Sequence, residues 1–365
     1  MSHAILRQPE TPSVASIVAD ELRPLVQRID TEGYYPADVL RNLGQAGAFS
    51  RHSASLGNGP AGILAATEAM AEVGASCLST AFCMWCQDAL VWYLDRAENP
   101  APRANYLQAA ATGHLLGGTG LSNPMKALAG FEPLALKGTR VDAGYRVTGR
   151  LPFVSNIENG HLFAGIFAVE GTTDGCVMAV FRAGSDGVTL TRNAHFIALE
   201  GTATVSVLIR DAFVPDDDVL SDDARRFVPH IRKGFVLLQA GMALGIARGA
   251  ARLMRQDGPS RRLAEYLPLG PDAIDARAAT LSERLADHVR NIEETGRASF
   301  LDVLRTRLDF SWLALEAAQA TVLQYGARGY LVGATPARRL REAQFVAIVT
   351  PSVKHITAEL ARGAG

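Results

Sequence analysis

Hydrophobic residues recur at helical spacing in the first third of the chain. Apolar positions repeat every three or four residues through Val14–Ile29 and again through Asp38–Ala46, which predicts amphipathic helices. Residues Ser79–Leu94 are apolar on nearly every side, so this helix is expected to be buried. We therefore predict a helical N-terminal domain over residues 1–114.

The spacing changes to alternation between residues 115 and 222. β-Branched and aromatic runs separated by Gly, Asp and Asn predict short strands, which we expect at Tyr145–Thr148, His161–Val169, Val177–Phe181 and Thr204–Ile209. Because no helical pattern separates these strands, the expected architecture is an antiparallel β-barrel.

Helical spacing returns from residue 223 to the C-terminus. Four long segments are expected to be helices: Phe235–Met254, Pro271–Ile292, Ala298–Tyr325 and Pro336–Leu360. Their lengths and short connections predict a four-helix bundle. The chain is thus expected to be a multidomain α+β protein with domains at 1–114, 115–222 and 223–365.

Composition narrows the functional classes. The chain has 365 residues, and its 36 Lys and Arg nearly balance its 37 Asp and Glu, which argues against binding nucleic acid or a membrane surface. No apolar run approaches the ~18 residues that span a bilayer, and the N-terminal MSHAILRQPE lacks the apolar core of a signal peptide. We therefore expect a cytoplasmic protein. Charged residues make up only 20% of the chain, which suggests buried subunit interfaces.

Motifs typical of other kinds of functional site are rejected because the surrounding sequence does not suit them. The stretch Gly57–Gly62 matches G-x-G-x-x-G, but it follows no predicted strand and lies between two helices, so it is rejected as a dinucleotide loop. Cys83 and Cys86 have C-x-x-C spacing inside an apolar helix, where buried thiols are expected. The eight histidines show no metal-binding spacing, so no metal site is predicted.

Five segments carry motifs in a fixed order along the chain. They are YYPADVLRNLGQAGAF (34–49), LLGGTGLSNP (115–124), YRVTGRLPFVSN (145–156), GTATVSVLIRDAFVPDDDVL (201–220) and QYGARGYLVGATPARRLREAQ (324–344). In this order they resemble motifs of the acyl-CoA dehydrogenase superfamily. The resemblance implies that fold, a bound FAD and a small-molecule substrate such as an acyl-CoA thioester. It also implies a homo-oligomer, dimer or tetramer, and an electron-transfer or flavin-reductase partner.

A flavin ring needs hydrogen bonds at its pyrimidine edge, a donor near N5 and a flat apolar wall against one face. The resemblance places the backbone of Leu121 and Ser122 at the pyrimidine edge. It places Phe153, Val154 and Ser155 at the wall and the N5 donor, with Phe153 where the family usually has Trp.

The resemblance also assigns residues around the flavin. Gly326 and Gly329 match family glycines that let the backbone approach the dinucleotide tail of a neighbouring subunit's FAD. Helix register alone places Trp85, Gln87 and Phe235 in the expected substrate pocket. The family's segments that hold the pyrophosphate and the adenine are not recognisable in this chain, so FMN or a reduced flavin supplied by a reductase is the alternative to FAD.

The expected catalytic carboxylate is missing. Dehydrogenation of an acyl thioester needs a base for the α-proton while the flavin takes the β-hydride. The resemblance puts Thr350 at the commoner position of that Glu and Phe235 at the rarer one, and neither can act as a base. Ser352 and His355 lie nearby in the sequence and are candidate hydrogen-bond donors for catalysis.

Two reactions and one non-catalytic role therefore stay open. The family resemblance implies a flavin-dependent oxidoreductase that acts on an acyl-CoA or a similar small molecule. The segment VDAGYRVTGRLPFVSN (141–156) is similar to a branch that uses reduced flavin and oxygen to hydroxylate aromatic or heteroaromatic substrates. Such a monooxygenase needs no carboxylate base. A non-catalytic flavoprotein is the third possibility.

Overall fold

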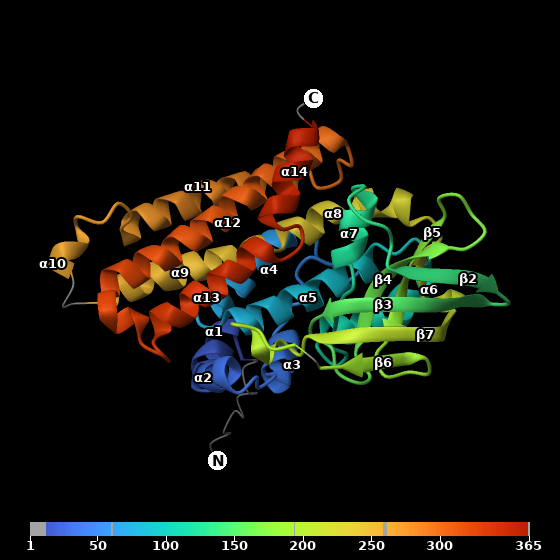
Figure 1. The fold of residues 1–365 in the computed structure, drawn as a ribbon, viewed down its shortest axis with the longest axis horizontal. Coiled ribbons are helices and arrows are strands. Elements are labelled where there is room, and N and C mark those ends of the chain that lie inside the picture. Colours follow the sequence, from blue (N-terminus) through green and yellow to red (C-terminus); the bar gives the residue numbers. More distant parts are fainter. Residues whose placement is uncertain (1–11, 60, 193, 258–260, 364–365) are drawn as a thin grey trace, which may run out of the picture.

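The computed structural model describes residues 12–59, 61–192, 194–257 and 261–363. N-terminal helices, a β-sheet and a C-terminal helical bundle follow one another along the chain, and Figure 1 shows the sheet and the bundle at opposite ends of an elongated molecule. Helix α5 (Leu78–Asp95) packs against strand β1 (Gly117–Thr119) of the sheet and against helix α9 (Ala240–Gln256) of the bundle. This helix therefore connects the cores of all three parts.

The N-terminal part is helical, as the sequence predicts. Its remaining elements are α1 (Val14–Ile17), the π-helical turn η1 (Val18–Leu22), α2 (Arg23–Thr31), α3 (Ala37–Gln45), α4 (Gly62–Gly74) and α6 (Pro100–Ala111). Asn99 begins α6 by accepting a hydrogen bond from the Ala101 amide at 3.0 Å. Every residue of α5 is buried, which confirms the prediction for Ser79–Leu94.

The central region is an eight-stranded sheet rather than a purely antiparallel one. Its order is β6-β7-β3-β2-β4-β5-β8, and β1 pairs with β4. The other strands are β2 (Leu136–Val141), β3 (Gly144–Val154), β4 (Leu162–Val169), β5 (Cys176–Arg182), β6 (Val188–Thr191), β7 (Val205–Pro215) and β8 (Val219–Ser221). Short helical elements within this region are α7 (Ser122–Leu128), η2 (Glu200–Thr202) and η3 (Asp216–Asp218).

The predicted antiparallel barrel is therefore wrong in its strand directions. Strand β4 pairs in parallel with both β1 and β2. After β3 the chain reverses, but β4 lies beside β2 instead of β3, which makes β4 parallel to β2. Alternating hydrophobicity shows that a strand has one buried face, and it carries no information on the direction of the neighbouring strand.

The described C-terminal part consists of helices, the longest of which are α9, α11 (Pro271–Arg290) and α12 (Arg297–Tyr325). In chain order the helices are α8 (Ala224–Leu237), α9, α10 (Arg261–Ala264), α11, α12, α13 (Thr335–Ile348) and α14 (Val353–Gly363), with the short turn η4 (Gly326–Tyr330) after α12. The packing of α9, α11, α12 and α13 agrees with the predicted bundle. The expected last helix, Pro336–Leu360, is divided at Val349–Ser352, where Pro351 has no N–H to continue the helical hydrogen bonds.

One stretch of the bundle is more apolar than the sequence prediction recognised. Residues Ala224–Gln256, which form α8 and α9, are long and apolar enough to cross a membrane by length and composition alone, but 94% of the most apolar window is buried inside the protein. Burial in the core accounts for this composition.

Candidate functional site

A cavity of about 270 Å³ lies where the N-terminal helices, the sheet and the bundle meet. Its walls come from α5, β1, α7, the end of β3, the segment before β7, α8 and the end of α13. The lining residues are Phe82, Trp85, Cys86, Thr119, Ser122, Phe153, Ser155, Phe196, Ala198, Leu199, Thr202, Thr204, Phe235, Phe345, Ile348, Val349 and Thr350. None of these lining residues is charged. The cavity therefore combines an apolar, aromatic wall with several hydroxyl groups.

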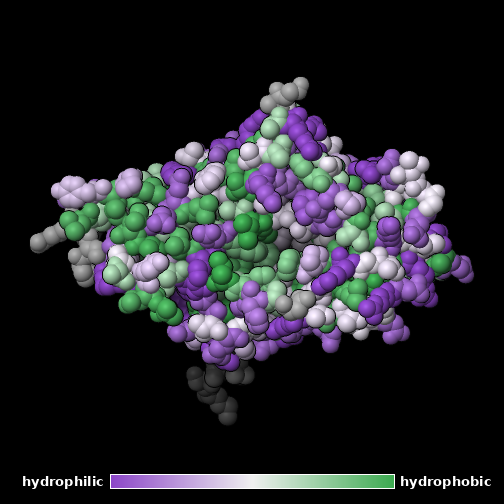
Figure 2. All heavy atoms as spheres, viewed as in Figure 1, coloured by the Kyte–Doolittle hydropathy of each residue, from purple (hydrophilic) through white to green (hydrophobic). Residues whose placement is uncertain are grey.

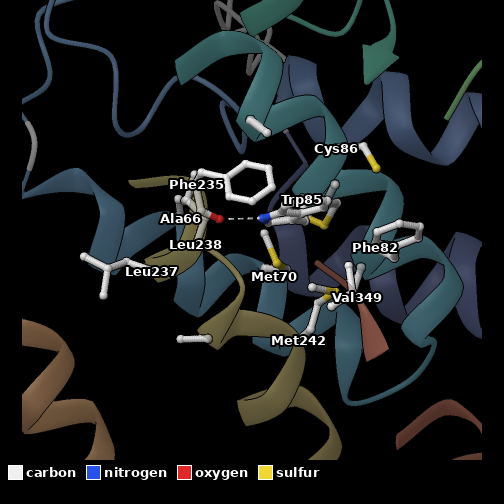
Figure 3. Close-up of a cluster of buried hydrophobic side chains, with 14 of the residues drawn as sticks. Ala66, Met70, Phe82, Trp85, Cys86, Phe235, Leu237, Leu238, Met242 and Val349 are labelled. Atoms are coloured by element: carbon white, nitrogen blue, oxygen red, sulfur yellow. Dashed lines mark hydrogen bonds between the residues drawn. The ribbon is translucent and has the colours of Figure 1, made fainter. Parts of the chain in front are cut away.

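Aromatic side chains form the wall on the helical side. The rings of Phe82 and Trp85 are stacked with centroids 5.7 Å apart, and Phe345 meets Phe82 edge-on at 4.5 Å. Phe235 meets Trp85 edge-on at 5.0 Å, and the Trp85 Nε1 donates a hydrogen bond to the Phe235 carbonyl at 3.1 Å (Figure 3). The structure thus brings together Trp85 and Phe235, two of the three residues predicted for the substrate pocket.

The third residue, Gln87, does not reach the cavity. Its Nε2 donates to the carbonyls of Ala110 and Leu115, both at 2.9 Å, and its Oε1 accepts a hydrogen bond from the Gly117 amide at 2.8 Å. The prediction of a substrate contact is therefore wrong, because both polar atoms of this buried side chain hold the start of β1. Its role is structural.

Hydroxyl groups face the cavity from the side of the sheet. Ser155 Oγ lies 2.6 Å from Thr204 Oγ1, and Ser122 Oγ lies 2.9 Å from Thr350 Oγ1. Phe153 is 57% exposed and extends beside these groups at the end of β3. A polar edge beside an exposed aromatic ring fits a flat heteroaromatic group such as a flavin ring, and no charged side chain lies in the way.

Two of the residues predicted to contact the flavin, Leu121 and Val154, are not among the residues that line the cavity. The Leu121 amide donates to Thr119 Oγ1 at 3.3 Å, and its carbonyl accepts from the Met125 amide at 3.0 Å, so both backbone groups are engaged within the turn that begins α7. Val154 is fully buried in the core of the sheet. Side chains alternate along a strand, so Val154 points away from the side that Phe153 and Ser155 take.

The three catalytic candidates separate in space. Thr350 lines the cavity, whereas Ser352 and His355 do not. Ser352 begins α14, where its carbonyl accepts from the Ile356 amide at 2.8 Å. His355 is buried behind that turn, with its Nε2 2.9 Å from Glu359 Oε1 and its ring edge-on to Phe131. The predicted catalytic roles of Ser352 and His355 are therefore not supported by their positions.

Gly326 and Gly329 lie in η4, between α12 and α13. Neither lines the cavity, and the junction of α12 and α13 lies at the end of the bundle away from the sheet (Figure 1). A contact with a flavin in this cavity of the same chain is therefore excluded. Their predicted contact with a neighbouring subunit's cofactor stays a prediction.

The sequence prediction missed a buried polar pair behind the cavity wall. Arg307 of α12 donates from Nε to Gln239 Oε1 at 2.7 Å, and Gln239 Nε2 donates to the Thr350 carbonyl at 2.8 Å. Burial lowers the pKa of the Arg307 guanidinium to about 10. The one available signal was Gln239 itself, a polar residue inside the apolar stretch Phe235–Met254.

Comparisons with known proteins agree with this fold. The family model for the acyl-CoA dehydrogenase N-terminal domain matches residues 11–114. Benzylmalonyl-CoA dehydrogenase of Aromatoleum aromaticum is 24% identical over 63% of this chain. The match spans 62% of the length of that protein, so this relative is matched over less than two thirds of its length. The short-chain acyl-CoA dehydrogenase of Clostridium acetobutylicum is 23% identical over 92% of this chain and 91% of its own length.

Solved structures show the same architecture. Butyryl-CoA dehydrogenase from Megasphaera elsdenii aligns with a TM-score of 0.82 at 16% identity, over 96% of both chains. KijD3, solved with FMN and a dTDP-linked amino sugar, aligns with a TM-score of 0.78 at 20% identity, over all of this chain and 96% of its own. On its N-terminal domain, its full-length relatives and its fold, the chain belongs to the acyl-CoA dehydrogenase superfamily.

Proposed function

We propose that this protein is a flavin-dependent oxidoreductase whose flavin ring occupies the cavity beside Ser122, Phe153 and Ser155. The hydroxyl groups and the exposed Phe153 ring support this placement, because they offer a polar edge and an apolar face. Structures of the same fold contain FAD in PigA, FADH2 in a glutaryl-CoA dehydrogenase and FMN in KijD3. FAD is our first choice and FMN the alternative, and titrating the protein with each flavin would decide between them.

We propose oxygenation of an aromatic or heteroaromatic substrate by reduced flavin and O2 as the reaction. One observation carries this choice: at the place expected for the carboxylate base, the Thr350 hydroxyl is paired with Ser122, and no lining residue carries an acid. In such a reaction one oxygen atom enters the substrate, the other leaves as water, and the reduced flavin supplies two electrons. A reductase or electron-transfer partner is therefore required.

The chain's own residues would bind and shield the reactants. Phe82, Trp85 and Phe235 present a tight aromatic surface against which a flat substrate can pack. The hydroxyl pair of Ser122 and Thr350 can donate one hydrogen bond into the cavity while keeping the other between them. The aromatic and aliphatic part of the lining would keep water away from the reactants, which limits side reactions of reactive species.

The alternative reaction is dehydrogenation of an acyl-CoA. The similarity to an acyl-CoA dehydrogenase over 92% of this chain favours it. It requires a base that the described lining of the cavity does not contain. Anaerobic titration with acyl-CoA thioesters of several chain lengths would separate the two, because a dehydrogenase bleaches its flavin without oxygen. The proposed oxygenase consumes O2 only when a reductase, its nicotinamide cofactor and an aromatic substrate are all present.

We also propose that the protein assembles as a homo-oligomer, a dimer or a tetramer, in the cytoplasm. Large apolar side chains are exposed on the bundle, among them Trp312 and Leu323 of α12 and Ile348 of α13. Figure 2 shows hydrophobic side chains gathered over the bundle, and such patches commonly mark protein interfaces. Sedimentation velocity of the purified protein would test this.

A further inference from the structure

Arg307 carries a charge into the core without an anion beside it. The residue is 2% exposed, and its three polar nitrogens donate to Gln239 Oε1, Ser311 Oγ and the Val346 carbonyl, all of them neutral acceptors. Burial lowers the pKa of this guanidinium, and within the described residues no carboxylate forms an ion pair with it. Removing a guanidinium from water is costly, and most buried charges are paired for that reason.

Other buried charges near α12 do have partners. On α13, Glu342 binds both Arg338 and Arg339, and on α14 His355 lies within 2.9 Å of Glu359. Arg307 differs from these because it faces only amide, hydroxyl and carbonyl oxygen atoms. A hydrophobic residue of similar volume would avoid the free-energy cost of burying a charge. We therefore looked for a function of the positive charge of Arg307.

The hydrogen bonds of Arg307 lead directly to the cavity wall. Because the guanidinium can only donate, it fixes the Gln239 amide with Oε1 toward itself and Nε2 toward the Thr350 carbonyl. It also covers the Val346 carbonyl in the last turn of α13, where the helix end carries partial negative charge. Residues Phe345 and Ile348–Thr350 of this same segment line the cavity. The cation therefore lies directly behind the wall that a substrate touches.

The lining of the cavity leaves that charge unopposed. No described lining residue carries a carboxylate, and Phe345, Ile348 and Val349 make the wall on the side of Arg307 apolar, so a field from Arg307 is weakly screened there. The aromatic surface of Phe82, Trp85 and Phe235 selects a flat ring. A flat ring that bears negative charge, such as a phenolate, satisfies both features.

We propose that Arg307, acting through Gln239, is a specificity-determining positioning residue that makes the cavity prefer an aromatic substrate in its anionic, phenolate-like form. This inference rests on the proposed function for the aromatic nature of the substrate. It deepens that function, because a phenolate is more electron-rich than the neutral phenol and is more readily oxygenated. Binding of the anion does not depend on turnover, so the two proposals can fail separately.

The test uses the purified protein, with and without added flavin, and 4-nitrophenol as the probe. The visible absorption of this phenol reports its ionisation, and nitrobenzene serves as a neutral ring of similar shape. We expect the apparent pKa of bound 4-nitrophenol to fall by about one unit relative to water, which equals a tenfold preference for the anion. Nitrobenzene should bind more weakly than the anion.

Two variants remove the charge in different ways. Arg307→Met deletes the cation, and Gln239→Glu places a carboxylate against it while keeping a hydrogen-bond acceptor for Arg307. Both should lose the anion preference, whereas Arg307→Lys should retain most of it. Arg305→Met on the exposed side of α12 is the matched control and should behave like the unaltered protein. Circular dichroism shows which variants are folded.

A purely structural role for Arg307 predicts a different pattern. Arg307→Met would then lower the melting temperature but leave the ionisation of the bound probe unchanged. That result, or an unshifted pKa in the unaltered protein, would overturn the proposal. Absence of binding by either probe would overturn it as well. If Arg307→Met does not fold, the same decision is made on Gln239→Glu, which pairs the buried cation but loses the hydrogen bond to the Thr350 carbonyl.

Discussion

Ser122 Oγ and Thr350 Oγ1 lie 2.9 Å apart and join the first turn of α7 to the segment between α13 and α14. The two residues are 228 positions apart in the chain. Both residues line the cavity, and Thr350 is the residue at which the sequence resemblance predicts the carboxylate of an acyl-CoA dehydrogenase. The hydroxyl pair is therefore the feature that decides between the two proposed reactions.

Replacing Thr350 by Glu tests this position directly. Thr350→Glu places a carboxylate beside Ser122, and if the rest of the site suits an acyl thioester, the variant should gain flavin bleaching by acyl-CoA under anaerobic conditions. Thr350→Val is the control, because it removes the hydroxyl without supplying a base. Stopped-flow absorbance measures the effect. If acyl-CoA bleaches the flavin of the unaltered protein as fast as that of Thr350→Glu, a base at another position must take the proton.

The variant Trp85→Phe distinguishes the contribution of the aromatic ring at position 85 from that of the indole hydrogen bond. The change keeps an aromatic surface but leaves the Phe235 carbonyl without the indole N–H, so we expect a loss of about 1–2 kcal/mol in unfolding free energy. Affinity for an aromatic ligand should fall only modestly. Urea denaturation gives the free energy, and Trp312→Phe on the exposed face of α12 is the control. An equal loss in both variants would contradict the role assigned to this bond.

Gln87 provides a stability test that is independent of ligand binding. Gln87→Leu leaves the Gly117 amide and the Leu115 carbonyl without their side-chain partner and removes one of the two hydrogen bonds to the Ala110 carbonyl, so unfolding free energy should fall by roughly 2–4 kcal/mol. Because Gln87 does not line the cavity, the variant that remains folded should bind flavin as the unaltered protein does. Gln319→Leu, on the exposed side of α12, should change neither property. If folded Gln87→Leu binds flavin much more weakly than the unaltered protein, Gln87 contributes to the binding site after all.

Asp95 makes stability depend on pH in the acid range. Burial alone would raise the pKa of this carboxyl, but hydrogen bonds from the Ser53 hydroxyl and from the Ser55 and Ala54 amides hold its pKa below the usual value. Its stabilising contribution is therefore fully present above the unfolded-state pKa of about 4 and is lost as the pH falls through the lower folded-state pKa.

The variant Asp95→Asn should therefore unfold more easily at neutral pH, and its unfolding free energy should change less between pH 6 and the acid limit. Denaturant titrations at several pH values measure both quantities. A pH dependence as steep as that of the unaltered protein would show that other carboxyl groups dominate acid unfolding.

Local patterns in the sequence predict most helices and strands, whereas long-range relationships escape them. The apolar spacing predicts the buried helix α5, and helix register predicts that Trp85 and Phe235 line the substrate pocket, where the structure brings them together across 150 residues. The parallel pairing of β4 depends on which edge of β2 it joins, and alternation does not encode this. His355 follows Thr350 closely in the sequence, but the turn at Pro351 directs it behind the cavity.

Arg307 shows the same limit for charged residues. In a helical pattern an arginine is expected to face solvent, because burial of a charge is rare. Its burial follows from the packing of α12 against α13 and from a partner 68 positions away, Gln239. Neither is visible in the spacing of apolar residues along α12.

The fate of molecular oxygen tests the proposed oxygenation most directly. The flavin-loaded protein is supplied with a flavin reductase, its nicotinamide cofactor, a panel of substituted phenols and ¹⁸O2, and the products are analysed by mass spectrometry. The proposed monooxygenase should add one ¹⁸O atom to a phenol, and this product should be absent when the flavin or the reductase is omitted. Flavin reduced by an acyl-CoA without oxygen, together with no labelled product from any phenol, would contradict this proposal.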